Sequence, residues 1–267
     1  MFSGALRAAG DAKTPMRLGI VMTTMNIVFN IVLIRGLGPI PAFGTAGAAM
    51  GTALASGITG VIFMWLLFSN RLVIQFTRTM SFRPDWAIIR QLFKFGLPAG
   101  IQGIAMNLGG VLMLRFIGSL EFSGEAQAAY SVGYTELFSL ITWTSVGLMG
   151  ATAAVAGQNL GAGKPERSAR STQAAALMGL GVAASIGILF VVIPRPLLSI
   201  FGMHDGVVVD LGVELLGYLA ISGLFVTVAL TYTGGLQGTG DTRSPLYISI
   251  ASQVVIPLGI CAAIQAT

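Results

Sequence analysis

Seven long apolar stretches limit what this chain of 267 residues can fold into more than any other feature of its sequence. A helix needs about 20 mainly apolar residues to cross the hydrocarbon core of a bilayer, where the backbone must satisfy its own hydrogen bonds. We therefore predict an all-α polytopic membrane protein whose main partner is the lipid bilayer. The seven spans are expected at residues 16–36, 44–69, 95–118, 126–157, 171–194, 207–237 and 245–266.

The composition agrees with this class and excludes others. Charged residues make up only 9% of the chain, against about a quarter in soluble domains. The single cysteine, Cys261, excludes an internal disulfide and a cysteine metal cluster, and the single histidine excludes most catalytic arrangements. We therefore predict that the protein is not an enzyme and holds no metal or cofactor. Its net charge of +5 comes from loops between spans, which argues against a nucleic-acid partner.

Residues 3–15 and 233–245 repeat one another at a distance of 230 positions. Both segments carry Gly, Leu, Gly, Asp and Pro at equivalent places, and Lys13 is matched by Arg243. The identical pairs are Gly4 and Gly234, Leu6 and Leu236, Gly10 and Gly240, Asp11 and Asp241, and Pro15 and Pro245. Six of the predicted spans lie between the two segments, and an internal repeat of six spans is typical of a secondary transporter.

Basic residues concentrate in alternate loops, which predicts the orientation of the chain. The positive-inside rule places such loops in the cytoplasm, so we expect a multi-pass protein of the cell (inner) membrane with both repeat motifs cytoplasmic. Because an even number of spans separates the motifs, the two repeats are expected to be parallel. The basic residues on this side are Arg7, Lys13, Arg17, Arg71, Arg78, Arg83, Arg90, Lys94, Lys164, Arg167, Arg170 and Arg243.

The longest polar stretch suggests where the domains divide. Residues 70–94 are basic and central, and we interpret them as a cytoplasmic linker. Residues 1–69 then form the end of an N-terminal lobe, and residues 95–267 form a C-terminal lobe. The third span is expected to begin at residue 95, with Pro98 in its first turn, where proline is tolerated.

Four motifs resemble those of the multidrug and toxic compound extrusion (MATE) family. They are Leu-Arg-x-x-Gly-Asp-x-x-x-Pro at 6–15, Gly-Ala-Ala-Met-Gly-Thr at 47–52, Gly-Leu-Pro at 96–98, and the glycine-rich Gly-Gln-Asn-Leu-Gly-Ala-Gly-Lys-Pro-Glu-Arg at 157–167. The last is the most specific. The resemblance extends to 198–202 and 212–219, and so covers essentially the whole chain.

The resemblance implies a V-shaped bundle of two parallel six-helix lobes that exports small organic molecules in exchange for Na⁺ or H⁺. Matched to that pattern, the chain would contain the tail of helix 4, helices 5 to 10 and most of helix 11. It is therefore expected to be a partial chain. The substrates implied are organic compounds, often cationic, the only cofactor-like group is the coupling ion, and the transporter is expected to be monomeric.

Polar residues on the first span are candidates for cation coupling. Thr23, Asn26 and Asn30 fall on one helical stripe, and their carboxamide oxygens suit a hard cation such as Na⁺. Hydrogen bonding between neighbouring helices is the other interpretation. The family resemblance implies a cation site that includes an Asn-x3-Asp pair and a Thr on the next helix. Asn26 matches the Asn, Asn30 replaces the Asp, and Thr52 matches the Thr.

Glu136 is the one carboxylate deep within a predicted span. With the span starting near residue 126, it lies about 15 Å into the bilayer. A charge at this depth usually faces a cavity or takes part in proton transfer. Gly133, Ser139 and Trp143 are expected on the same helical face. Glu136 is therefore a further coupling candidate, with a structural, hydrogen-bonded carboxyl as the alternative.

The substrate cavity has four candidate residues. Gln102 and Asn107 are the polar groups of the helix on which several family members carry coupling carboxylates. Tyr130 and Tyr134 share one helical face, where they would meet aromatic cations by cation–π contact or pack against a neighbouring helix.

Two other functions stay open from the sequence alone. One is a lipid-linked saccharide flippase of the same superfamily, which would need a strongly cationic cavity, whereas only Arg115 lies within a span. The other is a truncated membrane protein that does not transport.

Overall fold

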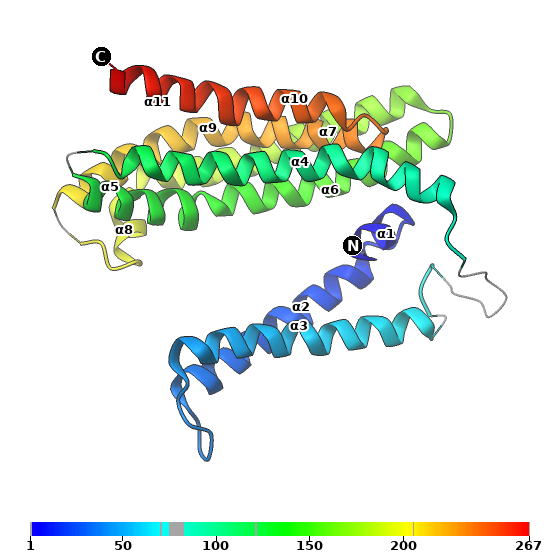
Figure 1. Cartoon of the computed structure of the whole chain (residues 1–267), viewed down its shortest axis with the longest axis horizontal. Coiled ribbons are helices and arrows are strands. Elements are labelled where there is room, and N and C mark those ends of the chain that lie inside the picture. The colour runs from blue at the N-terminus through cyan, green and yellow to red at the C-terminus, as the bar shows by residue number, and fades with distance from the viewer. Residues whose placement is uncertain (1, 70, 75–82, 121, 205, 267) are drawn as a thin grey trace. The chain divides into compact units, whose positions relative to one another are not determined.

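The computed structural model describes residues 2–69, 71–74, 83–120, 122–204 and 206–266, and these residues are almost entirely helical (Figure 1). Seven helical segments in them are long and apolar enough to span a membrane, as predicted. Their bounds are Lys13–Arg35, Gly44–Phe68, Trp86–Ile117, Ser123–Gly161, Pro165–Val192, Val207–Gly238 and Arg243–Gln265. The chain divides into two compact units, Met1–Arg83 and Pro84–Thr267.

The first unit is a helical hairpin preceded by a short helix. It consists of α1 (Phe2–Ala8), α2 (Lys13–Arg35) and α3 (Gly44–Phe68). The hairpin is tight because small residues of α3 meet the backbone of α2. A Cβ atom at Gly47 would overlap the carbonyl oxygen of Leu33, and one at Gly51 would overlap the side chain of Asn30. Such close approach brings the polar side chains of the two helices within reach of each other.

The second unit is a bundle built around one central helix. Its elements are α4 (Trp86–Ile117), α5 (Ser123–Tyr130), η1 (Ser131–Leu137), α6 (Ser139–Gly161), α7 (Pro165–Val192), α8 (Pro194–Ser199), α9 (Val207–Gly238), α10 (Arg243–Ile250), η2 (Ala251–Val255) and α11 (Ile256–Ala266). The elements η1 and η2 are π-helical stretches within long spans. Helix α9 packs against both α6 and α7, and its glycines allow close contact.

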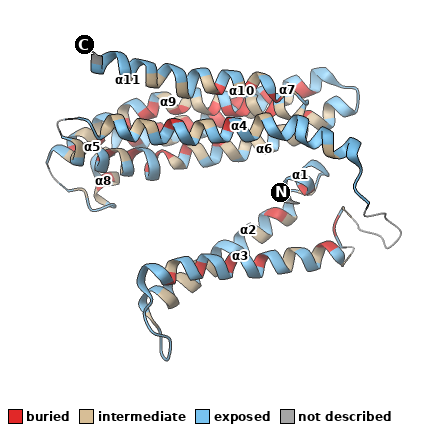
Figure 2. Cartoon of the chain, in the orientation of Figure 1, coloured by how far each residue is buried: buried red, intermediate tan, exposed pale blue. Residues whose placement is uncertain are grey.

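Burial in the second unit follows the pattern expected of a protein in lipid. The core residues Phe190, Ile141 and Leu216 are fully buried, and the buried positions lie along the inner faces of the helices (Figure 2). Large apolar side chains such as Trp143 and Phe225 face outward, with more than 70% of their surface exposed. An outward apolar surface of this extent is typical of a protein that lies in lipid.

Basic loops gather at one end of this bundle. Gly157, near the end of α6, approaches the carbonyl oxygen of Gly238 at the end of α9, and Phe95 of α4 lies near Gly240. The loops that carry Lys164 and Arg243 therefore share an end. The ion pair between Arg195 and Asp210, 3.1 Å long, lies at the opposite end, where α7 finishes and α9 begins. This is the separation of charge that the sequence predicts; the side of the membrane stays a prediction.

The two repeat motifs fold into the same turn. Gly10 and Gly240 both adopt a positive φ, 92° and 95°, which favours glycine. The amide of Asp11 donates to the carbonyl oxygen of Leu6 over 2.8 Å, and the amide of Asp241 donates to that of Leu236 over 2.9 Å.

Each Asp then caps the helix that follows. The amides of Thr14 and Ser244 donate to the carboxylates of Asp11 and Asp241 respectively, both over 3.0 Å. The side chains of Thr14 and Ser244 also hydrogen-bond to these carboxylates. The side-chain hydrogen bonds first, and the amide hydrogen bonds second, lower the pKa of both carboxyl groups. The sequence repeat is therefore also a structural repeat.

The predicted start of the third span was wrong. Helix α4 begins at Trp86 and not at residue 95, so Pro98 lies inside the helix. Asp85 fixes this earlier start because its side chain accepts hydrogen bonds from the amides of Ala87 and Ile88. The proposed linker 70–94 includes residues 75–82, which lie outside the described residues. The division between the units, after Arg83, falls within it, and the predicted domain bounds stay predictions.

Candidate functional site

Asn26, Asn30 and Thr52 form a polar cluster between α2 and α3. The amide nitrogen of Asn30 donates to Asn26 Oδ1 over 3.1 Å, and that of Asn26 donates to Thr52 Oγ1 over 3.1 Å. Thr52 in turn donates to the carbonyl oxygen of Ala48. The structure thus brings together the three residues that the sequence had selected on two different helices.

One atom of this cluster has no partner. Asn30 Oδ1 is buried, and among the described residues nothing donates a hydrogen bond to it. A buried oxygen without a donor is unfavourable by about 1–3 kcal/mol. Carboxamide and hydroxyl oxygens are suitable ligands for Na⁺. The only carboxylate in residues 1–83 is Asp11, in the loop before α2, so the cluster itself is neutral and does not titrate.

Glu136 lies in the π-helical stretch η1 and points away from the core. Its side chain is exposed, and within the described part of the chain no hydrogen bond or ion pair to its carboxylate is found. It lies 13 residues after the first residue of the span Ser123–Gly161, about 20 Å along a regular helix. The structure therefore places an unpaired carboxylate on the surface of the second unit, well inside a span.

The neighbours of Glu136 differ from those expected. The π-helical turn shifts the register, so that Gly133 is buried against Leu215 and does not share the face of Glu136. The hydroxyl of Ser139 donates to the backbone carbonyl of Glu136, over 2.6 Å, and not to its carboxylate. Trp143 is exposed, as is Glu136. The expectation that Gly133 shares the face of Glu136 was wrong because it assumed a regular α-helix.

Tyr130 and Tyr134 stack on each other. Their ring centroids are 4.9 Å apart with an angle of 11° between the rings, and Tyr134 also stacks on Phe138 at 5.4 Å. Tyr134 remains 44% exposed while Phe138 is buried. The three rings form an aromatic ladder in the order Phe138, Tyr134, Tyr130, and the middle ring is the most exposed of the three. A flat or cationic molecule that joined the stack would lie on Tyr130, the half-buried ring at its end.

Gln102 and Asn107 have different surroundings. Gln102 is buried and joins three helices, because it donates to Ser249 Oγ over 2.6 Å and accepts from Gln237 over 3.2 Å. Asn107 is exposed and donates to the carbonyl oxygen of Gly103 on its own helix. Among the described interactions, none joins either residue to the two tyrosines. The sequence did not reveal that Gln102 acts as a link between helices.

A buried hydroxyl cluster escaped the sequence reasoning. Ser145 of α6 and Thr227 of α9 are hydrogen-bonded to each other over 2.8 Å, and both are 1% exposed. Thr231, one turn further along α9, is fully buried and donates to the carbonyl oxygen of Thr227. Hydroxyls at a spacing of four residues on a glycine-rich helix were the available signal. Their geometry indicates helix–helix packing.

Comparison with known proteins identifies the family. A sequence model of the MatE family matches residues 98–262, more than half of the chain. The chain belongs to the multidrug and toxic compound extrusion (MATE) family. This is a family of membrane transporters and not of enzymes, in agreement with the prediction from the sequence.

Similar proteins extend the match to the rest of the chain. A probable multidrug resistance protein NorM of Thermotoga maritima is 26% identical over 253 residues, which cover 94% of this MATE chain and 53% of that protein. The protein of the same description from Deinococcus radiodurans is 28% identical, with 96% and 56% covered. A crystal structure of a MATE protein in the straight conformation has a TM-score of 0.85 at 21% identity, with 95% and 55% covered.

The chain spans about half the length of these relatives. The structural likeness supports the fold, with its seven long apolar helices.

Proposed function

We propose that the complete protein is a cation-coupled exporter of small organic molecules that works by alternating access. The family is one of transporters, and relatives carry the description of probable multidrug resistance proteins. Export against a gradient requires a coupling ion that binds the two states of the transporter with different affinity. The repeat motifs would lie in the cytoplasm, and the protein would act as a monomer in the cell membrane.

The Asn26–Asn30–Thr52 cluster carries the coupling part of this proposal. It provides a buried, unsatisfied oxygen, Asn30 Oδ1, between two helices of one lobe. Because the cluster has no group that titrates near neutral pH, it is suited to bind Na⁺ and not a proton. The positive charge of the ion would be balanced by a carboxylate from outside residues 1–83, since Asp11 lies in the loop before α2.

Glu136 supports proton coupling as the second candidate. Its exposed carboxylate lies inside a span and has no partner in the described part of the chain, and carboxylates at such a depth usually face a cavity or take part in proton transfer. The aromatic ladder of Tyr130 and Tyr134 begins in the same span and supports aromatic, often cationic, substrates.

Transport by the complete protein in liposomes decides between these routes. With an imposed Na⁺ gradient and no proton gradient, we expect export of an aromatic cation such as ethidium, because the neutral cluster binds Na⁺. Glu136→Gln is expected to leave Na⁺-driven export unchanged and to abolish export driven by a proton gradient. Export that depends on a proton gradient alone and survives changes in the cluster would overturn the Na⁺ proposal. No export under either gradient would overturn the exporter itself.

A further inference from the structure

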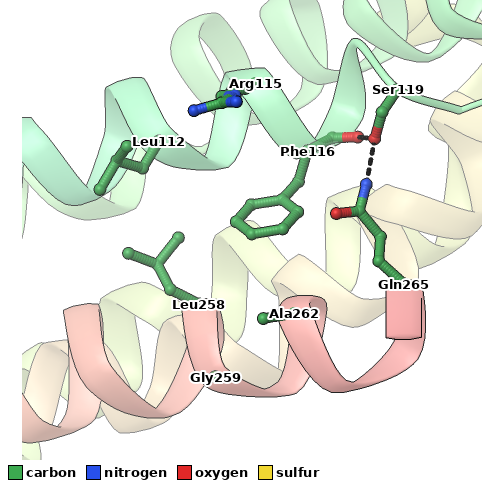
Figure 3. A pocket seen from close by; sticks show the side chains of 8 residues that line it. All are labelled: Leu112, Arg115, Phe116, Ser119, Leu258, Gly259, Ala262 and Gln265. Carbon is green, nitrogen blue, oxygen red and sulfur yellow. Dashed lines mark hydrogen bonds between the residues drawn. The ribbon is translucent and has the colours of Figure 1, made fainter. Parts of the chain in front are cut away.

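A pocket of about 780 Å³ lies between α4 and α11 in the second unit, and no residue of the proposed coupling or substrate sites lines it. Figure 3 shows Leu112 and Phe116 of α4 pointing toward α11, and Gln265 reaching from α11 to Ser119. The volume is within the range of about 300–1,000 Å³ that is usual for binding sites of small molecules. The lining residues are Leu112, Arg115, Phe116, Ser119, Leu258, Gly259, Ala262 and Gln265.

The two helices that form the pocket run parallel and are joined by contacts before the pocket and at its own level. Three contacts join α4 to the span Arg243–Gln265. Gln102 donates a hydrogen bond to Ser249 near the start of that span, and Gln265 donates one to Ser119 at its end. The sulfur atoms of Met113 and Cys261 lie 3.9 Å apart between them. Between these contacts the α11 side is small. A Cβ atom at Gly259 would meet no atom within 4 Å, so the space beside it is open. The pocket is therefore a fixed groove between two supported helices.

The walls of the pocket change character along the span. Leu112 and Leu258 lie deeper in the span, whereas the polar residues Arg115, Ser119 and Gln265 lie near the ends of the two helices together with Phe116. Span ends lie at the level of the lipid headgroups. The gradient from apolar to polar thus follows the gradient of a phospholipid, from acyl chain to headgroup.

The charge at the polar end has no counter-ion in the described part of the chain. Arg115 is exposed and forms no ion pair there, whereas Arg195 is paired with Asp210. A guanidinium near the end of a span is stabilised by a phosphate at the same depth, to which it can donate two hydrogen bonds. An anion with an apolar tail satisfies both the charge and the walls.

We propose that this pocket binds one anionic glycerophospholipid. The phosphate accepts hydrogen bonds from Arg115, the polar groups of Ser119 and Gln265 bond the ester region, and an acyl chain lies between Leu112, Phe116 and Leu258. The bound lipid completes the contact between α4 and α11, the two helices joined by the buried amide of Gln102. This site is separate from the coupling and substrate residues and does not depend on the direction or ion of transport.

Lipid retention by the purified complete protein tests the proposal. The protein is exchanged into detergent with equal amounts of phosphatidylglycerol and phosphatidylethanolamine, and bound lipid is counted by native mass spectrometry. We expect one phosphatidylglycerol to be retained in preference to phosphatidylethanolamine. Arg115→Gln is expected to lower its retention about tenfold, since a charge-assisted pair is lost. Arg195→Gln, at the paired arginine, is the matched control and is expected to retain lipid normally.

A second variant tests the shape of the pocket without changing its charge. Gly259→Leu places a side chain in the open space and is expected to exclude both lipids while the thermal unfolding temperature shows that the protein is folded. Equal retention by Arg115→Gln and Arg195→Gln would overturn the proposal, and so would normal retention by Gly259→Leu. Displacement of the lipid by inorganic phosphate would show a site for soluble anions and would likewise overturn it.

Discussion

Helix α2 and the span formed by α10, η2 and α11 are equivalent parts of the internal repeat, yet they resemble each other only at their beginnings. Both spans are 23 residues long, and both follow the same turn of a positive-φ glycine and a capping aspartate. Further along, Asn26 and Asn30 of α2 correspond to Ile256 and Ile260. The turn is fixed by backbone geometry, whereas the body of the helix is free to acquire or lose polar groups. The two sequences have therefore diverged where the backbone does not constrain the side chain.

The largest expected effect on transport comes from replacing Asn30 of α2 by isoleucine, the residue at the repeat-related position 260. Asn30→Ile removes both the donor to Asn26 and the buried oxygen, so we expect Na⁺-driven export by the complete protein to fall at least about tenfold. Asn30→Ala is the companion variant, because it removes the amide without adding bulk beside Gly51. The measurement is the initial rate of substrate export from proteoliposomes.

Two controls make this result specific. Thr24→Ala changes an exposed hydroxyl of the same helix that lies outside the stripe of Asn26 and Asn30, and Ile260→Asn places an amide at the repeat-related position. Neither is expected to change the dependence of transport on Na⁺. If Asn30→Ala exports at the wild-type rate, the cluster only joins α2 to α3.

The next largest effect is a loss of stability, which should be equal for the turns of the two repeats. Gly10→Ala and Gly240→Ala force a Cβ atom into a positive-φ conformation, and each is expected to destabilise the complete protein by about 1–2 kcal/mol. Neither site has a close neighbour that adds a steric term, since the nearest atom is 3.8 Å from a Cβ at Gly240 and none lies within 4 Å at Gly10. Thermal unfolding in detergent measures the change.

Gly19→Ala is the matched control for these variants, because Gly19 lies within α2, with open space around it. It is expected to leave the unfolding temperature unchanged or raise it slightly, since alanine favours the helix more than glycine. Loss of stability in only one of the two turn variants would show that the turns are not equivalent.

Whether a structural feature could be predicted depends on the physical property that the sequence pattern reports. The spans are predictable because length and apolarity are set by the bilayer, and the paired turns are predictable because Gly10 and Asp11 recur together at Gly240 and Asp241. The start of α4 was missed because Pro98 was taken to lie in a first turn, although Asp85 provides the cap of a helix that begins earlier.

The π-helical stretches could not be predicted in the same way. In a soluble helix the apolar stripe reports the helical period, but in lipid both faces are apolar and the period leaves little trace. Gly133 therefore gave no sign that η1 would turn it into the core, away from Glu136. The contact between Asn26 and Thr52 was predicted only through the family resemblance, since spacing along one helix does not identify a partner on the next.

A smaller effect is expected from the capping carboxylates. Asp11→Ala and Asp241→Ala each remove a helix cap, and we expect the unfolding temperature to fall by about 2 °C. Because hydrogen bonds lower the pKa of both groups, their contribution is complete from about pH 5 upward, one unit above the unfolded pKa, and is lost as the pH falls through the pKa of the folded state. The pKa of an aspartate in the unfolded chain is about four, so both carboxyl groups are ionised in both states from pH 5 to 8. The difference in unfolding temperature between wild type and each variant should therefore be constant over that range. A difference that changes across that range would contradict the assignment.

The smallest effect concerns the π-helical stretch η2, which α2 lacks. Pro257 follows η2 and has no amide hydrogen, so in a regular α-helix the carbonyl oxygen of Gln253 would lose its partner and meet the proline ring. The equivalent residue of α2 is Ile27, which can donate. Pro257→Ile should therefore let this span become α-helical throughout, with a change in stability under about 1 kcal/mol. Slower amide hydrogen exchange over residues 251–255 would show the change to an α-helix. Unchanged exchange would mean that packing against α4, and not Pro257, holds the π-helical stretch η2.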